Sequence, residues 1–364
     1  MSLSSHGCQT GNAFAVSQVK SSSRKPVTRT LRESPLGPVV SGGSLFDFPH
    51  ETVALHWMGH RPSDEYTPFL ALMHATDWAS FADAVDGYSL PGLTMVWAGT
   101  DGDIGKMIAC RVPARPRTAP ADIVVSADEA RAHWQTVLSA KSLPLDHNPA
   151  AGFVASANDE PDDPPATIGL YFSAPHRIER LRALLGARTD LTRADMIAFQ
   201  ADTLLEPAAA LAARLAALGA GVRTDSPVVA ALAAWDGRYD VGSAGALAFE
   251  LTVAGLIEAL EADGAAPPLS HHWRPFVRVT RLVEAADADR LAEALGGALD
   301  AADPLLARHG SWGGLHKVRL SHPLTRLPWL AARLPTLEFP SGVTNETLLK
   351  SAHPHTGEPH ASTF

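Results

Sequence analysis

Clustered histidines are the first residues whose type and spacing suggest chemistry. They occur in "SHHW" and in "HPHTGEPH", as His271, His272, His353, His355 and His360. Neighbouring imidazoles can bind a divalent metal ion such as zinc. No carboxylates accompany these histidines at the spacing of a metal site, so we expect no native metal site.

Two further motifs lack the spacing or the residues that their chemistry requires. "DVGSAG" around Ser243 lacks the Gly-x-Ser-x-Gly spacing of a hydrolase nucleophile, and it precedes a predicted helix instead of following a strand. "DGDIG" at Asp101 has two acidic residues but no glutamate that would close a calcium-binding loop. This second motif is therefore predicted to be a hairpin turn.

Composition and charge exclude several classes of protein. The chain has 364 residues, of which 46% are hydrophobic, and a formal net charge of −9 without a long basic run, which argues against a nucleic-acid partner. Two cysteines, Cys8 and Cys110, are too few for a disulfide framework or a zinc site. No stretch stays apolar over the roughly 18 residues that a membrane helix needs, so we expect no membrane partner. The compartment stays open, but without a secretory signal the sequence as given predicts a cytoplasmic chain.

The elements that must position any site are mostly strands in the first half of the chain. Runs of alternating or β-branched residues predict strands over residues 12–17, 51–59, 152–158 and 167–172. "LTMVWAG" and "IGKMIACRV" flank "TDGD" at residues 100–103, and Asp-Gly at a short turn predicts a β-hairpin. Apolar spacing of three and four predicts one helix over residues 67–88.

Helices dominate the second half. The same spacing predicts helices over residues 177–185, 192–218, 227–234, 244–262 and 287–307. Thr192 and Asp195 form a predicted capping box, and Pro207 is expected to break or kink the helix that contains it. Strands followed by helices predict an α+β fold in which sheets and helices form layers.

A set of short pieces, read together and in order, carries a family resemblance. The pieces are "GNAFAVS" from Gly11, "GPVVS" from Gly37, "AGTDGDIG" from Ala98, "FVASAND" from Phe153, "PHRIERL" from Pro175, "WDGRY" from Trp235 and "GGLHKVRLSHPL" from Gly313. Their order resembles the β-subunit of the penicillin acylase family, which are N-terminal-nucleophile amidohydrolases. The resemblance runs from Gly37 to nearly the end of the chain, and it implies a partial αββα sandwich with a helical insertion.

The resemblance also implies a chemistry and two site residues. Such enzymes cleave an amide with a serine at the start of the β-subunit, whose own α-amine, titrating near ~8, acts as the base. Neighbouring donors must then stabilise the oxyanion of the tetrahedral intermediate. Asn158 stands where the family has its oxyanion asparagine, although an asparagine before "DEP" is by itself typical of a turn. Arg177 stands where the family has an arginine beside the active site.

The match fails at the nucleophile. The serine position is held by Gly11, which has no side chain that could attack an amide. Thr10, Cys8 and Ser2 are nearby nucleophiles, but each is displaced from the required register, so we expect none of them to take over. The family's Asn-Asp-Pro-His segment and the acidic region after it are also missing, so the resemblance predicts no calcium site and no cofactor.

The sequence therefore divides into two expected parts. They are an irregular segment at residues 1–43 with a vestigial nucleophile strand, and a β-subunit-like region at residues 44–364, in which strands lie mainly at 44–172, helices at 175–308 and a tail at 309–364. The first hypothesis is an amidohydrolase of linear amides, with β-lactam or acyl-homoserine-lactone substrates, that is truncated and inactive as given. The alternatives are a non-catalytic protein that binds a carboxylic acid in a groove lined by Phe153, Tyr171 and Phe172, and a subunit that requires a separate α-subunit-like chain.

Overall fold

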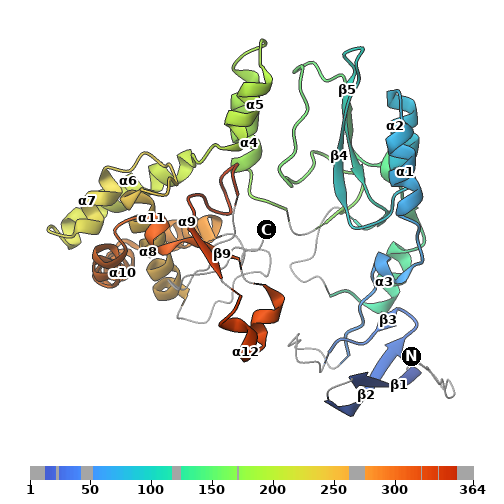
Figure 1. Ribbon diagram of the computed structural model, residues 1–364, viewed down its shortest axis with the longest axis horizontal. Coiled ribbons are helices and arrows are strands. Elements are labelled where there is room, and N and C mark those ends of the chain that lie inside the picture. Colours follow the sequence, from blue (N-terminus) through green and yellow to red (C-terminus); the bar gives the residue numbers. More distant parts are fainter. Residues whose placement is uncertain are drawn as a thin grey trace. The chain divides into compact units, whose positions relative to one another are not determined.

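A computed structural model describes residues 13–21, 24–41, 52–116, 124–169, 172–261, 275–320, 322–334 and 336–350. The chain forms two compact units (Figure 1). The first consists of Met1–Val154 and Glu160–Leu170, and the second of Ala155–Asp159 and Tyr171–Phe364.

The first unit contains small antiparallel sheets and short helices. Its strands are β1 (Ala13–Ser21), β2 (Arg24–Ser34), β3 (Gly37–Pro38), β4 (Leu93–Ala98), β5 (Ile104–Ala109), β6 (Val112–Pro113), β7 (Val137–Leu138) and β8 (Leu145–His147). They pair in the orders β1-β2-β3, β4-β5-β8 and β6-β7. Its helices are η1 (Met58–His60), α1 (Tyr66–His74), α2 (Trp78–Asp86), α3 (Ala127–His133) and η2 (Ala140–Ser142).

The hairpin β4–β5 confirms the prediction made from its Asp-Gly turn. Gly102 has a φ of +96°, a conformation that glycine adopts without strain, and the Gly99 N–H donates to the Asp103 carbonyl at 2.7 Å. Helix α2 packs against both strands (Figure 1). Phe81 and Val85 of α2 thereby cover Met107 of β5, and together they form a small buried core.

Several expectations for the first half are wrong. Residues 52–59 form no strand, because Ala54 makes only an isolated bridge with Val39 before η1 begins. The single helix expected over residues 67–88 is two helices, because the Asp77 side chain accepts from the Ser80 N–H and starts α2 anew. Residues 152–158 form no strand either: Gly152 and Asn158 both have positive φ, which a strand does not allow. Residues 167–169 and 172 are likewise not in a strand, and the intervening residues lie outside the described part.

The second unit is mainly helical. Its elements are α4 (His176–Gly186), α5 (Arg193–Gln200), α6 (Glu206–Val222), α7 (Pro227–Ala233), α8 (Ala244–Glu261), α9 (Pro275–Ala285), α10 (Ala288–His309), α11 (Trp312–Leu315), β9 (Lys317–Leu320), η4 (Pro323–Arg326), α12 (Pro328–Ala331) and β10 (Leu337–Pro340). The predicted helices are confirmed, with the capping box at Thr192 and a break before Pro207, which lies in the first turn of α6. Helix α9 was not predicted, although Phe276, Val279 and Val283 have helical spacing and are buried.

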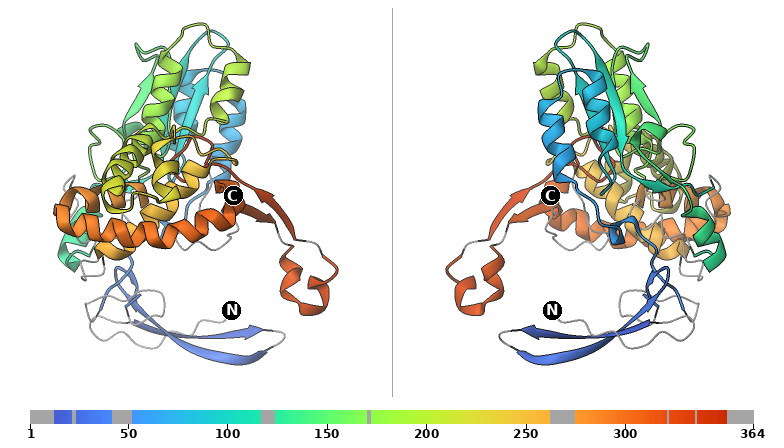
Figure 2. Two further views of the ribbon diagram at one scale, coloured as in Figure 1. Left: turned by 90° about the vertical axis from the view of Figure 1, so that its left-hand side faces the viewer. Right: turned by 90° about the vertical axis from the view of Figure 1, so that its right-hand side faces the viewer.

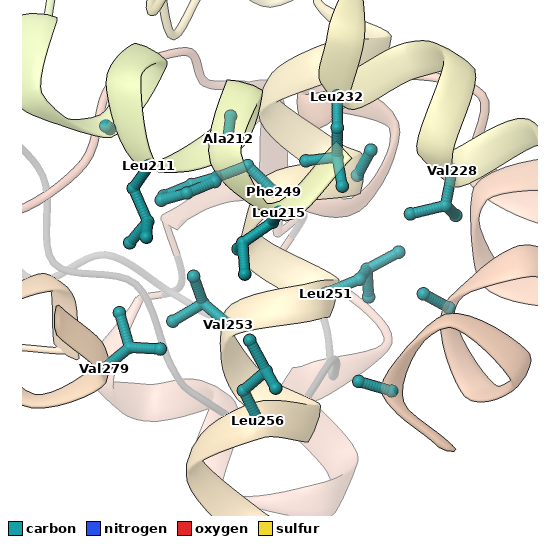
Figure 3. Packing of buried hydrophobic residues seen from close by; sticks show 14 of the residues in the cluster. Leu211, Ala212, Leu215, Val228, Leu232, Phe249, Leu251, Val253, Leu256 and Val279 are labelled. Carbon is teal, nitrogen blue, oxygen red and sulfur yellow. The ribbon is translucent and has the colours of Figure 1, made fainter. Parts of the chain in front are cut away.

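Helix α8 lies at the centre of this unit and packs against α7, α9 and α10. Most of its side chains, among them Phe249 and Leu256, are buried with residues of the surrounding helices (Figure 3). Helices α8 and α10 approach closely, because a Cβ at Gly255 would lie only 2.8 Å from the Cβ of Ala298. Strands β9 and β10 pair as a separate two-stranded ribbon that leads to η4 and α12, drawn in red in Figure 2.

The chain is α+β, as predicted. The first unit combines small antiparallel sheets with short helices, and the second is mainly helical with one two-stranded sheet. Of the helices within the described ranges, none combines the length and the apolar character that a membrane crossing requires.

Candidate functional site

The segment Ala155–Asp159, which belongs to the helical unit, places Asn158 in a strained conformation. Asn158 has a φ of +60°, in the left-handed region that asparagine enters more readily than most residues. Its carbonyl accepts from the Ser173 N–H at 2.7 Å, and the Asp159 carboxylate accepts from the Ala157 N–H at 2.8 Å. Ala157 is buried, whereas the Asn158 side chain is exposed and can donate to a group from outside.

Arg177 fixes the peptide that precedes Asn158. It lies in the first turn of α4, which begins after Pro175, and its Nη1 donates to the Ala157 carbonyl at 3.1 Å. Burial lowers the pKa of the Arg177 guanidinium, while the carboxylates of Glu346 and Asp159 act in the opposite direction. The two residues that the family register singled out are therefore brought together, through the backbone of Ala157.

Sequence reasoning did not identify two further charged residues at this place. Glu346 is only 4% exposed, and its carboxylate acts on the charge of both Arg177 and Lys350. Burial lowers the pKa of the Lys350 ammonium, the Arg177 guanidinium lowers it further, and the Glu346 carboxylate opposes both. Buried charges require compensation by opposite charges, so these side chains form one electrostatic cluster. No motif in "TNETLLK" indicates that its glutamate is buried.

The segment that carries Glu346 is anchored in the helical core. The Val343 N–H donates to the Tyr239 carbonyl at 2.7 Å, and the indole N–H of Trp312 donates to the Val343 carbonyl at 2.8 Å. Thr347 is fully buried, and its hydroxyl oxygen accepts from the Thr344 N–H at 3.0 Å. The segment is thus held in place by backbone and hydroxyl hydrogen bonds and not only by its charges.

A second arginine of α4 connects the same parts. Arg180 binds Asp202 through two hydrogen bonds, of 3.2 Å from Nε and 2.7 Å from Nη2. The Asp202 carboxylate raises the pKa of the Arg180 guanidinium. The Asp202 carbonyl in turn accepts from the Leu349 N–H at 3.1 Å. Helix α4 and the segment around Glu346 are therefore joined by hydrogen bonds through Asp202.

Several residues named from the sequence lie outside the described residues. These are Gly11, Tyr171 and the five clustered histidines. Of the other residues expected to line an acyl groove, Phe153 and Phe172 are both half-buried. Within the described part of the chain, no group of three or more histidine, cysteine, aspartate or glutamate residues could hold a metal ion.

The arrangement can stabilise negative charge on a bound oxygen. A neutral amide that is exposed on a fixed backbone can donate a hydrogen bond to an acceptor, as an oxyanion donor must. The Arg177 cation behind it adds a favourable field, because a partly buried charge is weakly screened. Asn158 and Arg177 together could therefore hold a carboxylate, or the oxyanion of an acyl-transfer intermediate.

Comparison with known proteins gives concordant matches. The sequence profile of the penicillin amidase family matches residues 13–363. The chain is 30% identical over 350 residues to penicillin acylase 2 proenzyme from Pseudomonas sp. (strain SE83), a match that covers 90% of this chain and 44% of that protein. It is 27% identical over 239 residues to acyl-homoserine lactone acylase QuiP from Pseudomonas putida, covering 54% of this chain and 29% of that protein. The chain thus spans less than half the length of these curated relatives.

The fold has a counterpart among solved structures. The thermostable penicillin G acylase from Alcaligenes faecalis superposes with a TM-score of 0.57 at 17% sequence identity, over 83% of this chain and 61% of that one. At this identity the likeness shows the fold alone, and it confirms the expected fold of N-terminal-nucleophile hydrolases.

Proposed function

Because this chain belongs to the penicillin amidase family, we propose that it provides the acyl-binding and oxyanion-stabilising part of an amidohydrolase that acts on linear amides. The observation that carries the proposal is a hydrogen bond from Arg177 to the Ala157 carbonyl, which precedes Asn158. Asn158 has a left-handed backbone, and its side-chain amide is exposed. The relatives are named as a penicillin acylase and an acyl-homoserine lactone acylase. We therefore propose an acylated amine of the β-lactam or homoserine-lactone type as substrate.

In this proposal Asn158 donates to the oxygen of the acyl group, and Arg177 holds Asn158 in place. A turnover step also needs a nucleophile, and the position that would supply it is Gly11. Glycine has no hydroxyl or thiol, so no acyl-enzyme ester can form at this position. We therefore expect the isolated chain to bind the acyl group without hydrolysing the amide.

Two measurements on the full chain test this proposal. Binding of phenylacetate or of a fatty acid is measured by calorimetry, and turnover is measured with a chromogenic phenylacetyl anilide. We expect binding without turnover, and binding that is weakened in Asn158→Ala but unchanged in Asp300→Asn, which removes an exposed carboxylate paired with Arg223. Absence of binding would contradict the acyl site. Turnover above the buffer rate that is lost in Asn158→Ala would contradict the inactivity and support the role of Asn158, since one oxyanion donor contributes roughly a hundred- to a thousandfold in rate.

The proposal includes a second polypeptide chain. Leu320, Leu337 and Phe339 lie on one face of the β9–β10 ribbon and are each about half exposed, at 48%, 51% and 49%. A two-stranded ribbon with an uncovered apolar face is marginally stable in water and prone to associate. We expect the purified chain to aggregate or to unfold over a broad temperature range in size-exclusion and thermal-melting experiments. A monodisperse monomer with a sharp transition would contradict the need for a partner.

A further inference from the structure

The imidazole of His176 lies in the first turn of α4, next to Arg177. Both of its ring nitrogens are buried, and neither has a hydrogen-bond partner within the described residues. A neutral imidazole carries one donor and one acceptor, and both are costly to bury unpaired. An apolar ring would occupy this position without that cost, so the histidine calls for a functional explanation.

The His176 ring is held by an aromatic contact. It meets the Phe276 ring of α9 edge-on, with ring centroids 5.0 Å apart and planes at 81°. Phe276 is only 8% exposed. It packs in turn against Phe249 of α8, which is labelled in Figure 3, with ring centroids 6.3 Å apart. His176 therefore connects the first turn of α4 to the core of the helical unit.

The same turn positions the candidate acyl site. Arg177 follows His176 directly in the chain. Its Nη1 donates to the Ala157 carbonyl at 3.1 Å, and Ala157 precedes Asn158. The Asn158 carbonyl accepts from the Ser173 N–H at 2.7 Å, three residues before His176. A displacement of this turn would therefore act on the Asn158 loop through both hydrogen bonds.

Burial dominates the titration of His176. It lowers the pKa of the imidazole below the ordinary value of 6.5, and the Glu179 carboxylate on the same helix opposes this effect. Glu179 is exposed, so water and salt screen its charge. On the other side α9 presents the uncharged Phe276 ring, and Arg278 of α9 is paired with Glu261 of α8. The neutral imidazole is therefore the form that fits the buried position.

We propose that His176 is a positioning residue of the acyl site. Its neutral imidazole, packed against Phe276, holds the first turn of α4 and with it the Arg177 hydrogen bond to the Ala157 carbonyl, and a proton taken up by the ring releases that turn. A charged imidazole is costly to bury without hydrogen bonds, so the protonated ring moves away from Phe276 into water. The inference rests on the proposed function only in assigning a purpose to Asn158.

The direction of the pH dependence follows from the lowered pKa of His176. The folded chain holds this imidazole neutral to a lower pH than the open chain does. The stability that it gives to the turn is therefore fully present above pH 6.5, and it is lost as the pH falls through the lower folded pKa. Each pKa unit corresponds to about a tenfold change in the equilibrium between the closed and the open turn.

Hydrogen exchange of the Ser173 amide tests the proposal in the full chain without any ligand. That amide donates to the Asn158 carbonyl, so its protection factor reports whether the loop is closed, independently of the intrinsic effect of pH on exchange. We expect this factor to fall about fivefold or more between about pH 7.5 and 5, while the amides of α8 keep theirs. This range lies above the pKa of ordinary carboxyl groups.

Two substitutions separate the proton from the packing of the ring. His176→Phe keeps an aromatic ring against Phe276 but cannot take up a proton. We expect it to keep the Ser173 protection factor of neutral pH and to abolish the decrease in acid. The matched control is His147→Phe, which replaces a histidine stacked on Trp78 in the other unit and should retain the full decrease.

A third substitution tests the route from the turn to the loop. Arg177→Gln removes the hydrogen bond to the Ala157 carbonyl. The Ser173 protection factor should therefore be low at both pH values, and its decrease in acid should be smaller than in the unsubstituted chain, because both changes act on one shared interaction. An undiminished decrease in Arg177→Gln would overturn the proposed route.

Two further outcomes overturn the proposal. One is a Ser173 protection factor that changes by less than about twofold over this pH range in the unsubstituted chain, and the other is an equal decrease in His176→Phe. Where His176→Phe does not yield folded protein, the His176 imidazole is titrated by NMR in the unsubstituted chain, and a pKa of 6.5 or above overturns the proposal.

Failure of this inference is distinguishable from failure of the proposed function. Absence of phenylacetate binding together with the expected pH pattern at Ser173 would contradict the acyl site and leave the positioning role of His176 standing. Phenylacetate binding without that pH pattern would overturn the role of His176 and leave the acyl site standing.

Discussion

Replacing Asn158 by glycine and by alanine separates the effect of backbone strain on stability from the effect of the side-chain amide on ligand binding. Both substitutions delete the side-chain amide that is proposed to donate to the acyl oxygen. Only alanine places a Cβ-bearing residue without a stabilising polar side chain at a φ of +60°. The two variants should therefore differ in stability and agree in ligand binding.

The expected magnitudes follow from the backbone conformation. Holding an ordinary L-residue in the left-handed region costs about 1–2 kcal/mol, whereas glycine enters it without strain and loses about 0.5–1 kcal/mol through the greater freedom of the unfolded chain. Relative to asparagine, which tolerates this region, we expect Asn158→Ala to be less stable by about 1 kcal/mol and Asn158→Gly to be nearly neutral. For a unit of roughly 200 residues, 1 kcal/mol corresponds to about 2–4 °C in the melting temperature.

Binding should respond to the lost amide alone. A hydrogen bond to a charged acceptor contributes about 1.5–3 kcal/mol, so phenylacetate should bind roughly 10- to 150-fold more weakly to both variants. The assays are differential scanning fluorimetry and calorimetric titration on the same preparations. Equal melting temperatures for the alanine and glycine variants would refute the strained backbone, and unimpaired binding by the glycine variant would refute the donor role.

Three other substitutions test the nucleophile position, the core and the response to acid. Gly11→Ser should not restore amide hydrolysis, because no free α-amine adjoins the new hydroxyl without cleavage. Mass spectrometry should find the chain intact. A product that is cleaved before residue 11 and hydrolyses the anilide would contradict this prediction. Leu256→Ala should destabilise the helical unit by about 2–5 kcal/mol, because Leu256 is fully buried. Leu218 is 41% exposed, so Leu218→Ala should lower the melting temperature far less than Leu256→Ala does. Equal decreases in melting temperature would contradict the central burial of Leu256. Hydrogen bonds from an asparagine and a histidine lower the pKa of the Asp103 carboxyl in the folded chain. The stability that the ionised carboxylate contributes is therefore fully present above the unfolded pKa of ~3.9, and it is lost as the pH falls through the lower folded pKa. In melts between about pH 5 and 2, Asp103→Asn should therefore lose less stability than the unsubstituted chain, and identical pH profiles would show that the carboxyl titrates normally.

The helices of the second unit were predictable because their signals are local. Helix α8 buries residues along nearly its whole length, and α10 begins where the Asp287 side chain accepts from the Arg290 N–H. Two of the failed predictions are explained by a cap or a turn residue that interrupts an apolar pattern. The Asp77 cap divides α1 from α2, and the positive φ of Asn158 ends the extended pattern of "FVASAN".

The site was predictable only in part. Asn158 and Arg177 were paired by the order of the family motifs, whereas their actual link, the hydrogen bond to the Ala157 carbonyl, depends on how α4 enters the unit. Glu346 could not be found from the sequence. Its burial arises from tertiary contacts of the 343–350 segment with Tyr239, Trp312 and Asp202, none of which is a neighbour in sequence.

The cost of this charge cluster indicates that it serves something other than stability. Removing charged groups from water is expensive, and replacing a buried ion pair by apolar residues of similar volume is often neutral or stabilising by about 1–4 kcal/mol. A fold selected for stability alone would gain little from Arg177, Glu346 and Lys350 at one place. At this place the Arg177 guanidinium donates to the carbonyl that precedes the left-handed Asn158, and the Glu346 and Asp159 carboxylates oppose the effect of burial on its charge. In the proposed function the fixed backbone of Asn158 serves the binding of an acyl oxygen, whether or not position 11 supplies a nucleophile.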